Sequence, residues 1–307
     1  CGCGTGRAPV IRNLNPETGR FIVTRDPSEF EVFFHVGLGR AASTYLQNRV
    51  FPKLEGIRYI HRDRYRAFRK IIDRSRHTKY LVSREAARRL KDRLREFAEY
   101  RRDGKVILVL RRHDQWIASH YRRYVKNGGS HSFESFLDLD GNHPVLWGRD
   151  DLEFMTMIRS AEHYFDRPPL VLFQEELTNN LERFVARLTA FTGTTCDPTR
   201  INPNPTHRSY STHRLKVARK IGASLFPPIP THHPNPTLHR VQRRAHLVLC
   251  HLILALAKCV PASVVGDEPL IIPEQLARVH DETANDWASC LAFAAAHNPT
   301  PEQPTLS

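Results

Sequence analysis

The sequence predicts a three-layer α/β fold, in which helices flank a central parallel sheet of about five strands and a helical extension follows. Three observations support it. Short, continuously apolar runs rich in branched residues are typical of strands buried on both faces of a parallel sheet. Helical patterns lie between most of these runs, as in βαβ units. The chain has 307 residues, 40% of them hydrophobic, which is enough to form a full core.

The apolar runs divide the chain into strands and connections. We expect the five strands at 32–36, 57–60, 79–83, 106–110 and 170–173, and a shorter one at 21–23. The expected organisation is a polar lead-in (1–30), the α/β core (31–222), a proline-rich hinge with C-terminal helices packed on the core (223–298), and a disordered tail (299–307).

Apolar stripes with the helical period predict the helices. A helix over 85–102 places Leu90, Leu94 and Phe97 on one stripe, and Gly104 ends it. Further helices are expected over 179–191, 239–258, 273–280 and 281–296. The apolar run 247–260 is too short to span a bilayer and is interpreted as a buried helix.

A glycine-bearing loop follows the first core strand and reads Gly37-Leu38-Gly39-Arg40-Ala41-Ala42-Ser43-Thr44. Such a strand-to-helix turn directs backbone N–H groups and a helix N-terminus at one point, which attracts an anion, most often a phosphate. Gly37 and Gly39 let the backbone bend and approach a ligand. Arg40 adds a positive charge, and Ser43 and Thr44 add hydroxyl donors. The Gly-Lys pair of a Walker A loop is missing, and an ordinary glycine-softened turn is the alternative.

The same architecture returns at residues 106–121. An apolar strand ends at Leu110, and Arg111 follows at its carboxyl end. Asp114 suits a helix N-cap. Ser119 lies eight residues after Arg111, about two turns into the helix. Ligands of open α/β sheets bind at this edge.

These segments resemble the sulfotransferase family. Residues 35–47 are similar to a bacterial loop of the form His-x-Gly-Leu-x-Lys-Thr-Gly-Thr-Thr-x-Leu-Gln, which holds the 5′-phosphosulfate of 3′-phosphoadenosine 5′-phosphosulfate (PAPS). Arg111 and Ser119 match the Arg and Ser that hold the 3′-phosphate of PAPS. Residues 171–177 resemble a late strand ending in Tyr-Glu-Asp-Leu, and 204–214 resemble an Asn-x-Ser-Leu-Ser region that closes over the nucleotide.

The resemblance covers residues 31–221 and implies a P-loop NTPase-like fold, with the first strand between the third and fourth. It implies sulfuryl transfer from PAPS to a hydroxyl or amine, without a metal. The donor-binding residues that it implies are Gly37, Gly39, Arg40, Ala41, Ala42, Ser43, Thr44, Arg111, Ser119, Arg208 and Ser209. The loop departs from the family at Arg40, where the family has Lys, and at Ala42, where it has Gly.

Arg40 and Glu85 are the candidate catalytic residues. Arg40 and the loop amides would stabilise charge on the leaving phosphate. The third strand ends Ser83-Arg84-Glu85, similar to the family's Ser-x-Glu, so Glu85 would lie beside the loop and serve as general base. The alternative for Glu85 is an acid in the first turn of its helix. His113 and His120 are other candidate bases, otherwise expected on a helix surface.

The composition narrows the partners. The net charge is +14, which favours anionic partners. Arginines cluster at 61–76 and 84–102, and we interpret them as a solvated helix face. The acceptor is expected to be a small molecule or glycan, with the basic surface favouring an anionic one, and no nucleic acid is expected. Six cysteines without zinc or disulfide spacing indicate a cytoplasmic protein.

Three rival interpretations stay open. A P-loop-type small-molecule kinase would share the fold but should have Gly-Lys-Ser/Thr and an acidic Mg²⁺ ligand. A nucleic-acid binder would explain the charge but should interleave aromatic and basic residues. A catalytically weak nucleotide-binding relative would explain Arg40 and Ala42. The pair Glu175 and Glu176 is interpreted as structural, and the many histidines lack a completed metal-ligand set.

Overall fold

The computed structural model describes residues 11–14, 21–24, 26–86, 88–141, 146–204, 210–225 and 235–300. These divide into two compact units. The first takes the described parts of 1–110, 155–204 and 289–307, and the second takes those of 111–154 and 205–288. The division cuts across the expected core of 31–222, because 111–154 and 210–222 belong to the second unit. Most of the proline-rich hinge (226–234) and of the tail (301–307) lies outside the described residues.

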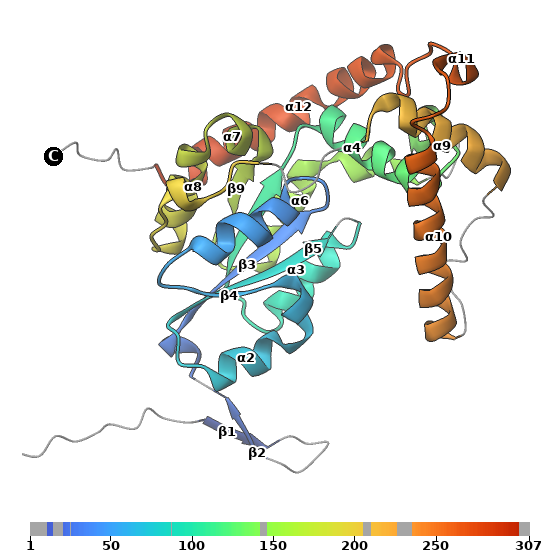
Figure 1. The fold of residues 1–307 in the computed structure, drawn as a ribbon. Coiled ribbons are helices and arrows are strands. Elements are labelled where there is room, and N and C mark those ends of the chain that lie inside the picture. Colours follow the sequence, from blue (N-terminus) through green and yellow to red (C-terminus); the bar gives the residue numbers. More distant parts are fainter. Residues whose placement is uncertain are drawn as a thin grey trace, which may run out of the picture. The chain divides into compact units, whose positions relative to one another are not determined.

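The first unit is built on a five-stranded parallel sheet (Figure 1). Its strands are β3 (Glu31–Leu38), β4 (Arg58–Ile60), β5 (Lys79–Ala86), β6 (Lys105–Leu110) and β9 (Leu170–Phe173). All five expected strands are therefore confirmed. The order β4-β5-β3-β6-β9 places the first core strand between the third and fourth, as the resemblance implied. From β3 the chain first adds β4 and β5 on one side and then β6 and β9 on the other, and open α/β sheets place their ligand crevice at such a switch in strand order.

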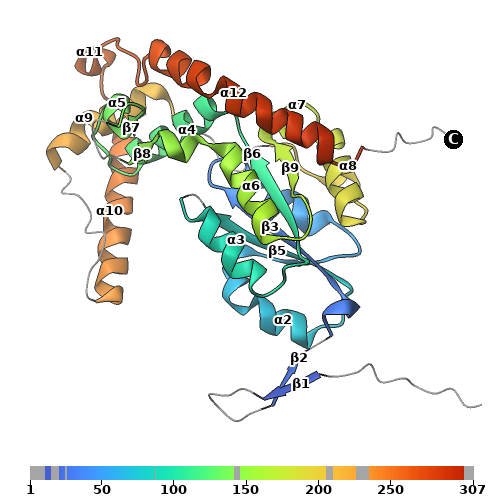
Figure 2. The ribbon, with the colours of Figure 1, turned by 180° about the vertical axis from the view of Figure 1, so that it is seen from behind.

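Helices cover both faces of this sheet (Figures 1 and 2). On one face, Phe33 and Leu172 pack with Phe184 and Leu188 of the helix α8. On the other, Phe34 stacks on Phe97, with ring centroids 4.0 Å apart. Alternating side chains of β3 thus reach both layers. The covering helices are α2 (Phe68–Arg74), α3 (Leu90–Ala98), α6 (Phe154–Tyr164), α7 (Gln174–Asn179) and α8 (Leu181–Thr192).

The expected helix over 85–102 is shorter, since α3 runs from Leu90 to Ala98. Its buried stripe of Leu90, Leu94 and Phe97 is as expected. The start was wrong because β5 keeps its parallel pairing with β3 as far as Ala86, opposite Leu38. Inter-strand hydrogen bonding here outweighs local helix propensity, so Glu85 is a strand residue.

Two cationic side chains, Lys79 and Arg101, form hydrogen bonds between separate segments of the first unit. Lys79 at the start of β5 donates to the carbonyl oxygen of Thr192 at 3.0 Å, and also to that of Gly193, where α8 ends with a left-handed glycine. This places a charge where the helix dipole favours a cation. Arg101, 5% exposed, binds both oxygens of Asp103 and donates to the carbonyl oxygen of Phe30 at 3.2 Å.

The second unit is mainly helical. Its elements are α4 (His113–Lys126), α5 (Phe133–Phe136), β7 (Leu137–Asp138), β8 (Trp147–Gly148), α9 (Thr212–Leu225), α10 (Pro236–Leu256), α11 (Ala262–Val265) and the part of α12 (Pro273–His297) before Ser289. The expected pair of helices over 273–280 and 281–296 is one helix, because neither glycine nor proline interrupts it.

The apolar run in α10 is only partly buried, contrary to expectation. Cys250 and Leu254 are buried, whereas Leu249, Leu252 and Leu256 are exposed. None of the described helices combines the length and the apolar character needed to cross a membrane. The short strand expected at 21–23 is present as β2 (Phe21–Thr24), which pairs antiparallel with β1 (Ile11–Leu14).

Candidate functional site

The loop after β3 has a strained backbone. Arg40 and Ala42 have φ angles of 72° and 59°, and they are the described non-glycine residues in the left-handed region. Each such residue costs roughly 1–2 kcal/mol and persists only where the surroundings enforce it. The helix α1 (Ser43–Tyr45) begins directly after Ala42. A helix therefore starts at this sheet edge, as the sequence predicted, and the binding of an anion there stays a prediction.

Buried contacts hold the loop in this conformation. Ala41 is fully buried and Ser43 is 2% exposed. The Ser43 hydroxyl donates to the carbonyl oxygen of Leu38 at 2.9 Å, and the Ala41 N–H donates to the same oxygen at 3.2 Å. Ser43, expected to bind a phosphate through its hydroxyl, thus closes the loop on itself. Its role as a phosphate ligand stays a prediction, as does that of the half-exposed Thr44.

Gly37 is required by packing beneath the loop. A Cβ atom on Gly37 would lie 2.3 Å from the Ser43 Oγ atom and 2.7 Å from Cε1 of His35. The space beside the Gly37 Cα atom is thus occupied by the side chains of Ser43 and His35. Their packing requires glycine at this position whether or not the loop binds a ligand.

A buried polar network supports the loop from below, and the sequence analysis missed it. His35 Nδ1 lies 2.9 Å from the Ser83 Oγ atom, directly across the β3–β5 ladder. The Gln47 side chain donates to the same oxygen at 2.9 Å. Burial lowers the pKa of His35 from 6.5 to about 3, so the ring is neutral, and its Nδ1 atom shares a hydrogen bond with the Ser83 hydroxyl. The signal in the sequence that could have revealed this network is the presence of polar residues, His35 and Ser83, within apolar strand segments.

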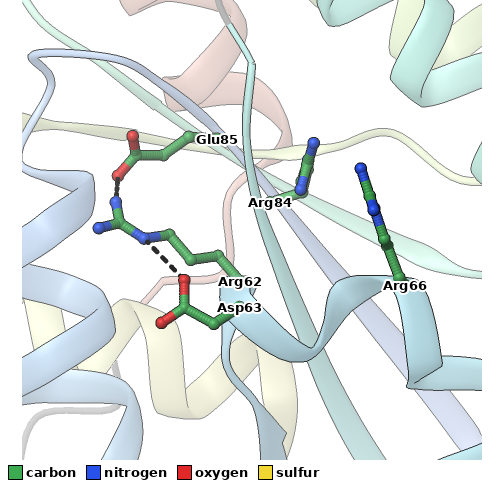
Figure 3. A pocket seen from close by; sticks show the side chains of 5 residues that line it. All are labelled: Arg62, Asp63, Arg66, Arg84 and Glu85. Atoms are coloured by element: carbon green, nitrogen blue, oxygen red, sulfur yellow. Dashed lines mark hydrogen bonds and ion pairs between the residues drawn. The ribbon is translucent and has the colours of Figure 1, made fainter. Parts of the chain in front are cut away.

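Glu85 lies next to the loop, because it is the β5 residue paired with Gly37. Its carboxylate accepts a hydrogen bond from Arg62 (Figure 3). Arg62 comes from the 3-10 turn Arg62–Ala67 that follows β4, and its Nε lies 3.7 Å from the Asp63 carboxylate. Since Glu85 lies in the strand β5, the alternative that it is an acid in the first turn of a helix is wrong. A carboxylate oriented by a second side chain is the usual arrangement of a general base.

The other predicted ligands lie in the second unit or outside the described residues. Arg111 and Ser119 are both partly exposed, Ser119 on α4. Arg111 directly follows Leu110, the last residue of β6, and β6 is the neighbour of β3 in the sheet. Arg208 and Ser209 lie outside the described residues. The loop and Glu85 are therefore brought together, and the 3′-phosphate site stays a prediction.

Comparison with solved structures finds sulfotransferases. A sulfotransferase from Alicyclobacillus acidocaldarius is 15% identical, with a TM-score of 0.45 over 75% of this chain and 97% of the other. The mouse sulfotransferase SULT7A1, solved in complex with PAP, is 16% identical, with a TM-score of 0.37 over 79% of this chain and 98% of the other. No protein-family model and no curated protein matches the chain. The functional evidence therefore comes from the residues of this chain.

Expectations for the start of α4 need correction. Asp114 lies inside the first turn of the helix and binds Arg112 through two hydrogen bonds of 2.7 and 2.9 Å, whereas Arg112 occupies the N-cap position. His113 is fully buried, with its Nε2 atom 3.0 Å from the Asp286 carboxylate and its ring stacked on Phe154. It was expected on the surface, and its burial within the second unit argues for a structural role.

The other polar residues that the sequence singled out are the pair Glu175 and Glu176, the cysteines and the possible metal ligands. Glu176 contacts Arg183 and Arg187 of α8 at 3.2 Å each, which is the structural role expected of it. The described cysteines (196, 250, 259 and 290) form no disulfide bonds with one another. Over the described ranges, no three His, Cys, Asp or Glu side chains group in a way that could hold a metal ion.

Replacing Ala42 by glycine should stabilise the protein. Glycine adopts a φ of 59° without the steric cost that alanine bears, so Ala42→Gly should raise the free energy of unfolding by about 1 kcal/mol. The matched control is Ala41→Gly, the buried neighbour outside the left-handed region, which should lower it. Urea unfolding followed by circular dichroism measures both. A loss of stability in Ala42→Gly would mean that the left-handed conformation is not adopted.

Acid should destabilise the protein through His35. Because the folded pKa (about 3) lies below the unfolded value of 6.5, the unfolded chain binds more protons between these limits, and stability falls as the pH drops below 6.5. The loss between pH 7.5 and pH 5 should be about 2 kcal/mol. The variant His35→Asn, which keeps an acceptor for Ser83, should show a flatter dependence over that interval. Urea unfolding at a series of pH values measures this dependence. If His35→Asn lost as much stability between pH 7.5 and pH 5 as the wild type, His35 would not be buried as a neutral ring.

Proposed function

We propose that this protein is a sulfotransferase that moves a sulfuryl group from PAPS to a hydroxyl or amine acceptor. The observation that carries the proposal is the strained loop of residues 37–44, held at the carboxyl edge of the sheet with Glu85 beside it. Left-handed alanine and arginine residues cluster at functional sites, where the surrounding structure offsets their cost. The same residues carry the sequence resemblance to the family's 5′-phosphosulfate loop.

The loop fits a phosphate group in its charge and its donors. Arg40 is exposed and cationic, and α1 starts two residues after Ala41. Because the Ser43 hydroxyl is already engaged with Leu38, backbone N–H groups and Thr44 supply the remaining donors. The Ala42 methyl group is the feature that opposes close approach of a phosphate oxygen. It favours, as a second candidate function, a nucleotide-binding relative with weak activity.

Arg111 and Ser119 would hold the 3′-phosphate of the donor. Arginine suits this because its planar fork binds two oxygens of one phosphate. The family spacing of eight residues is kept between them. The donor, when bound, supplies a sulfuryl group linked to a good leaving phosphate. No metal is needed in this scheme, in which the protein aligns the reactants and stabilises charge.

Glu85 would accept the proton of the acceptor. In the transfer, the acceptor oxygen or nitrogen forms a bond to sulfur while the bond from sulfur to the bridging oxygen breaks. The acceptor proton passes to a Glu85 carboxylate oxygen, and the released phosphate takes the electron pair. Arg40 and the loop N–H groups stabilise the charge that develops there. Arg62 orients Glu85 through their ion pair.

Binding of desulfated donor, 3′-phosphoadenosine 5′-phosphate, tests the nucleotide site directly. Isothermal titration calorimetry without Mg²⁺ should detect binding to the wild type, and Arg111→Ala should weaken it at least tenfold through the lost charge-assisted bonds. Arg122→Ala, which changes an exposed arginine on the following helix α4, is the control and should bind normally. A preference for ATP with Mg²⁺ would instead support a kinase.

The Glu85→Gln variant tests the base. Transfer of labelled sulfate from PAPS to a panel of hydroxyl and amine acceptors should fall 10²–10³-fold in kcat, which is typical for loss of a general base. Binding of the desulfated donor should persist. Glu99→Gln, an exposed carboxylate on the same unit, should leave turnover unchanged. Normal turnover in Glu85→Gln would remove Glu85 from the mechanism.

A further inference from the structure

A small pocket opens beside Glu85 (Figure 3). Its volume is about 200 Å³, and its lining residues are Arg62, Asp63, Arg66, Arg84 and Glu85. The pocket follows from the unequal length of two strands. β4 ends at Ile60, opposite Val82, whereas β5 continues to Ala86. After β4 the chain forms the turn Arg62–Ala67. The last residues of β5 therefore have side chains of this turn beside them, where a longer β4 would have paired with them.

The charges that line this pocket are unbalanced. Arg62 contacts both of the acidic residues, Asp63 and Glu85. In the described ranges, neither Arg66 nor Arg84 forms an ion pair with a carboxylate. The Nε atom of Arg84 is buried and has no hydrogen-bond partner. Two guanidinium groups in the pocket therefore lack an ion-pair partner among the described residues, and the three arginines and two carboxylates of the lining leave one net positive charge.

An anion is the ligand that such a pocket favours. A buried donor without a partner costs free energy, and a bound oxyanion would remove that cost. Guanidinium groups bind carboxylates and sulfates through pairs of parallel hydrogen bonds. The Arg84 guanidinium carbon lies 5.0 Å from the centre of the Tyr65 ring, an aromatic face that restricts its position. Arg66 is exposed and therefore accessible to a ligand from solvent.

The strand order assigns this anion to the acceptor. β3 and its loop lie in the middle of the sheet, β6 lies on one side of β3, and β5 with Arg84 lies on the other. In the proposed function, the donor's phosphates belong to the loop and to Arg111. The pocket is at the β5 side of β3, opposite the β6 side, and next to the proposed base, which is where an acceptor hydroxyl must be.

We propose that the pocket binds an anionic group of the acceptor through Arg66 and Arg84 and so places a neighbouring hydroxyl at Glu85. The group is a carboxylate or sulfate, and a volume of about 200 Å³ accommodates it. This inference rests on the proposed function. It makes Arg66 and Arg84 specificity-determining residues, and the acceptor a hydroxyl compound with an anionic group, for which acidic saccharides serve as probes.

Matched acceptors test the inference. Methyl glucuronide, methyl glucoside 6-sulfate and uncharged methyl glucoside present similar hydroxyls and differ in the anionic group. With PAPS as donor, kcat/KM of the wild type should be at least tenfold higher for one of the anionic acceptors than for the glucoside. The favoured acceptor distinguishes a carboxylate site from a sulfate site. Equal values for all three would overturn the inference while leaving the sulfotransferase function intact.

Variants of the pocket locate the effect. Arg66→Ala should reduce the preference for the anionic acceptor about tenfold, whereas Arg64→Ala, an exposed arginine of the same turn outside the lining, should leave it unchanged. Arg84→Lys keeps the strand intact and removes the fork, so it should reduce the preference as well. If Arg64→Ala lost the preference for the anionic acceptor to the same extent, general surface charge would explain the preference. That result would contradict the proposal that the pocket binds the anionic group.

Equilibrium binding separates this inference from the proposed function. Titration of methyl glucuronide and of the 6-sulfate into the protein without donor should show binding that Arg66→Ala weakens about tenfold. This result would support the anion site even if no acceptor were sulfated and the desulfated donor did not bind, which would contradict the sulfotransferase function. Weaker binding of the desulfated donor in Arg66→Ala, with saccharide binding unchanged, would assign the pocket to the donor and overturn the inference.

Discussion

The candidate site depends on the register of the ladder between β3 and β5. Parallel strands pair residue by residue, and this pair stays in register from Glu31 opposite Lys79 to Leu38 opposite Ala86. The register sets His35 across from Ser83 and Gly37 across from Glu85. A slip by one residue would exchange the faces of every side chain on the strand. The same ladder therefore determines what lies beneath the loop and which carboxylate stands next to it.

The strained loop and the buried network form one structural unit. Arg40 and Ala42 together cost roughly 2–4 kcal/mol of backbone strain. Burial of Ala41 and Ser43 and the hydrogen bonds to Leu38 oppose that cost. Below them, His35 fills the space against Gly37, and Ser83 satisfies one of its ring nitrogens. A rigid loop can direct its N–H groups at a ligand without reorganisation, which is what stabilisation of a developing charge requires.

The arginine-rich turn after β4 has a more specific structure than a solvated face. Arg62 orients Glu85, and Arg66 faces the same pocket as Arg84 of the strand. Arg64 and the other arginines of the segment are outside the pocket lining. A net charge of +14 indicates only that the protein attracts anions. The early end of β4 concentrates part of that charge next to a carboxylate.

Local patterns determined much of the fold. The apolar runs determined all five strands, and the stripe of Phe184, Val185 and Leu188 with Gly193 beyond it determined α8, because burial and left-handed termination are local requirements. The family resemblance supplied the strand order and the loop. Sequence patterns failed where distant residues compete. They gave a helix start for β5 residues that the ladder retains, a cap role for Asp114, and a surface position for His113, which Asp286 and Phe154 bury.

The sequence by itself thus determined which segments form strands and helices and which loop can meet an anion. The tertiary structure alone decided the strain at Ala42, the network under Gly37, the pairing of Arg62 with Glu85, and the meeting of Arg66 and Arg84 in one pocket. The physical reason is that periodicity reports which face of an element is buried. It does not report which residue from another element packs against that face, and such contacts depend on strand register and strand length.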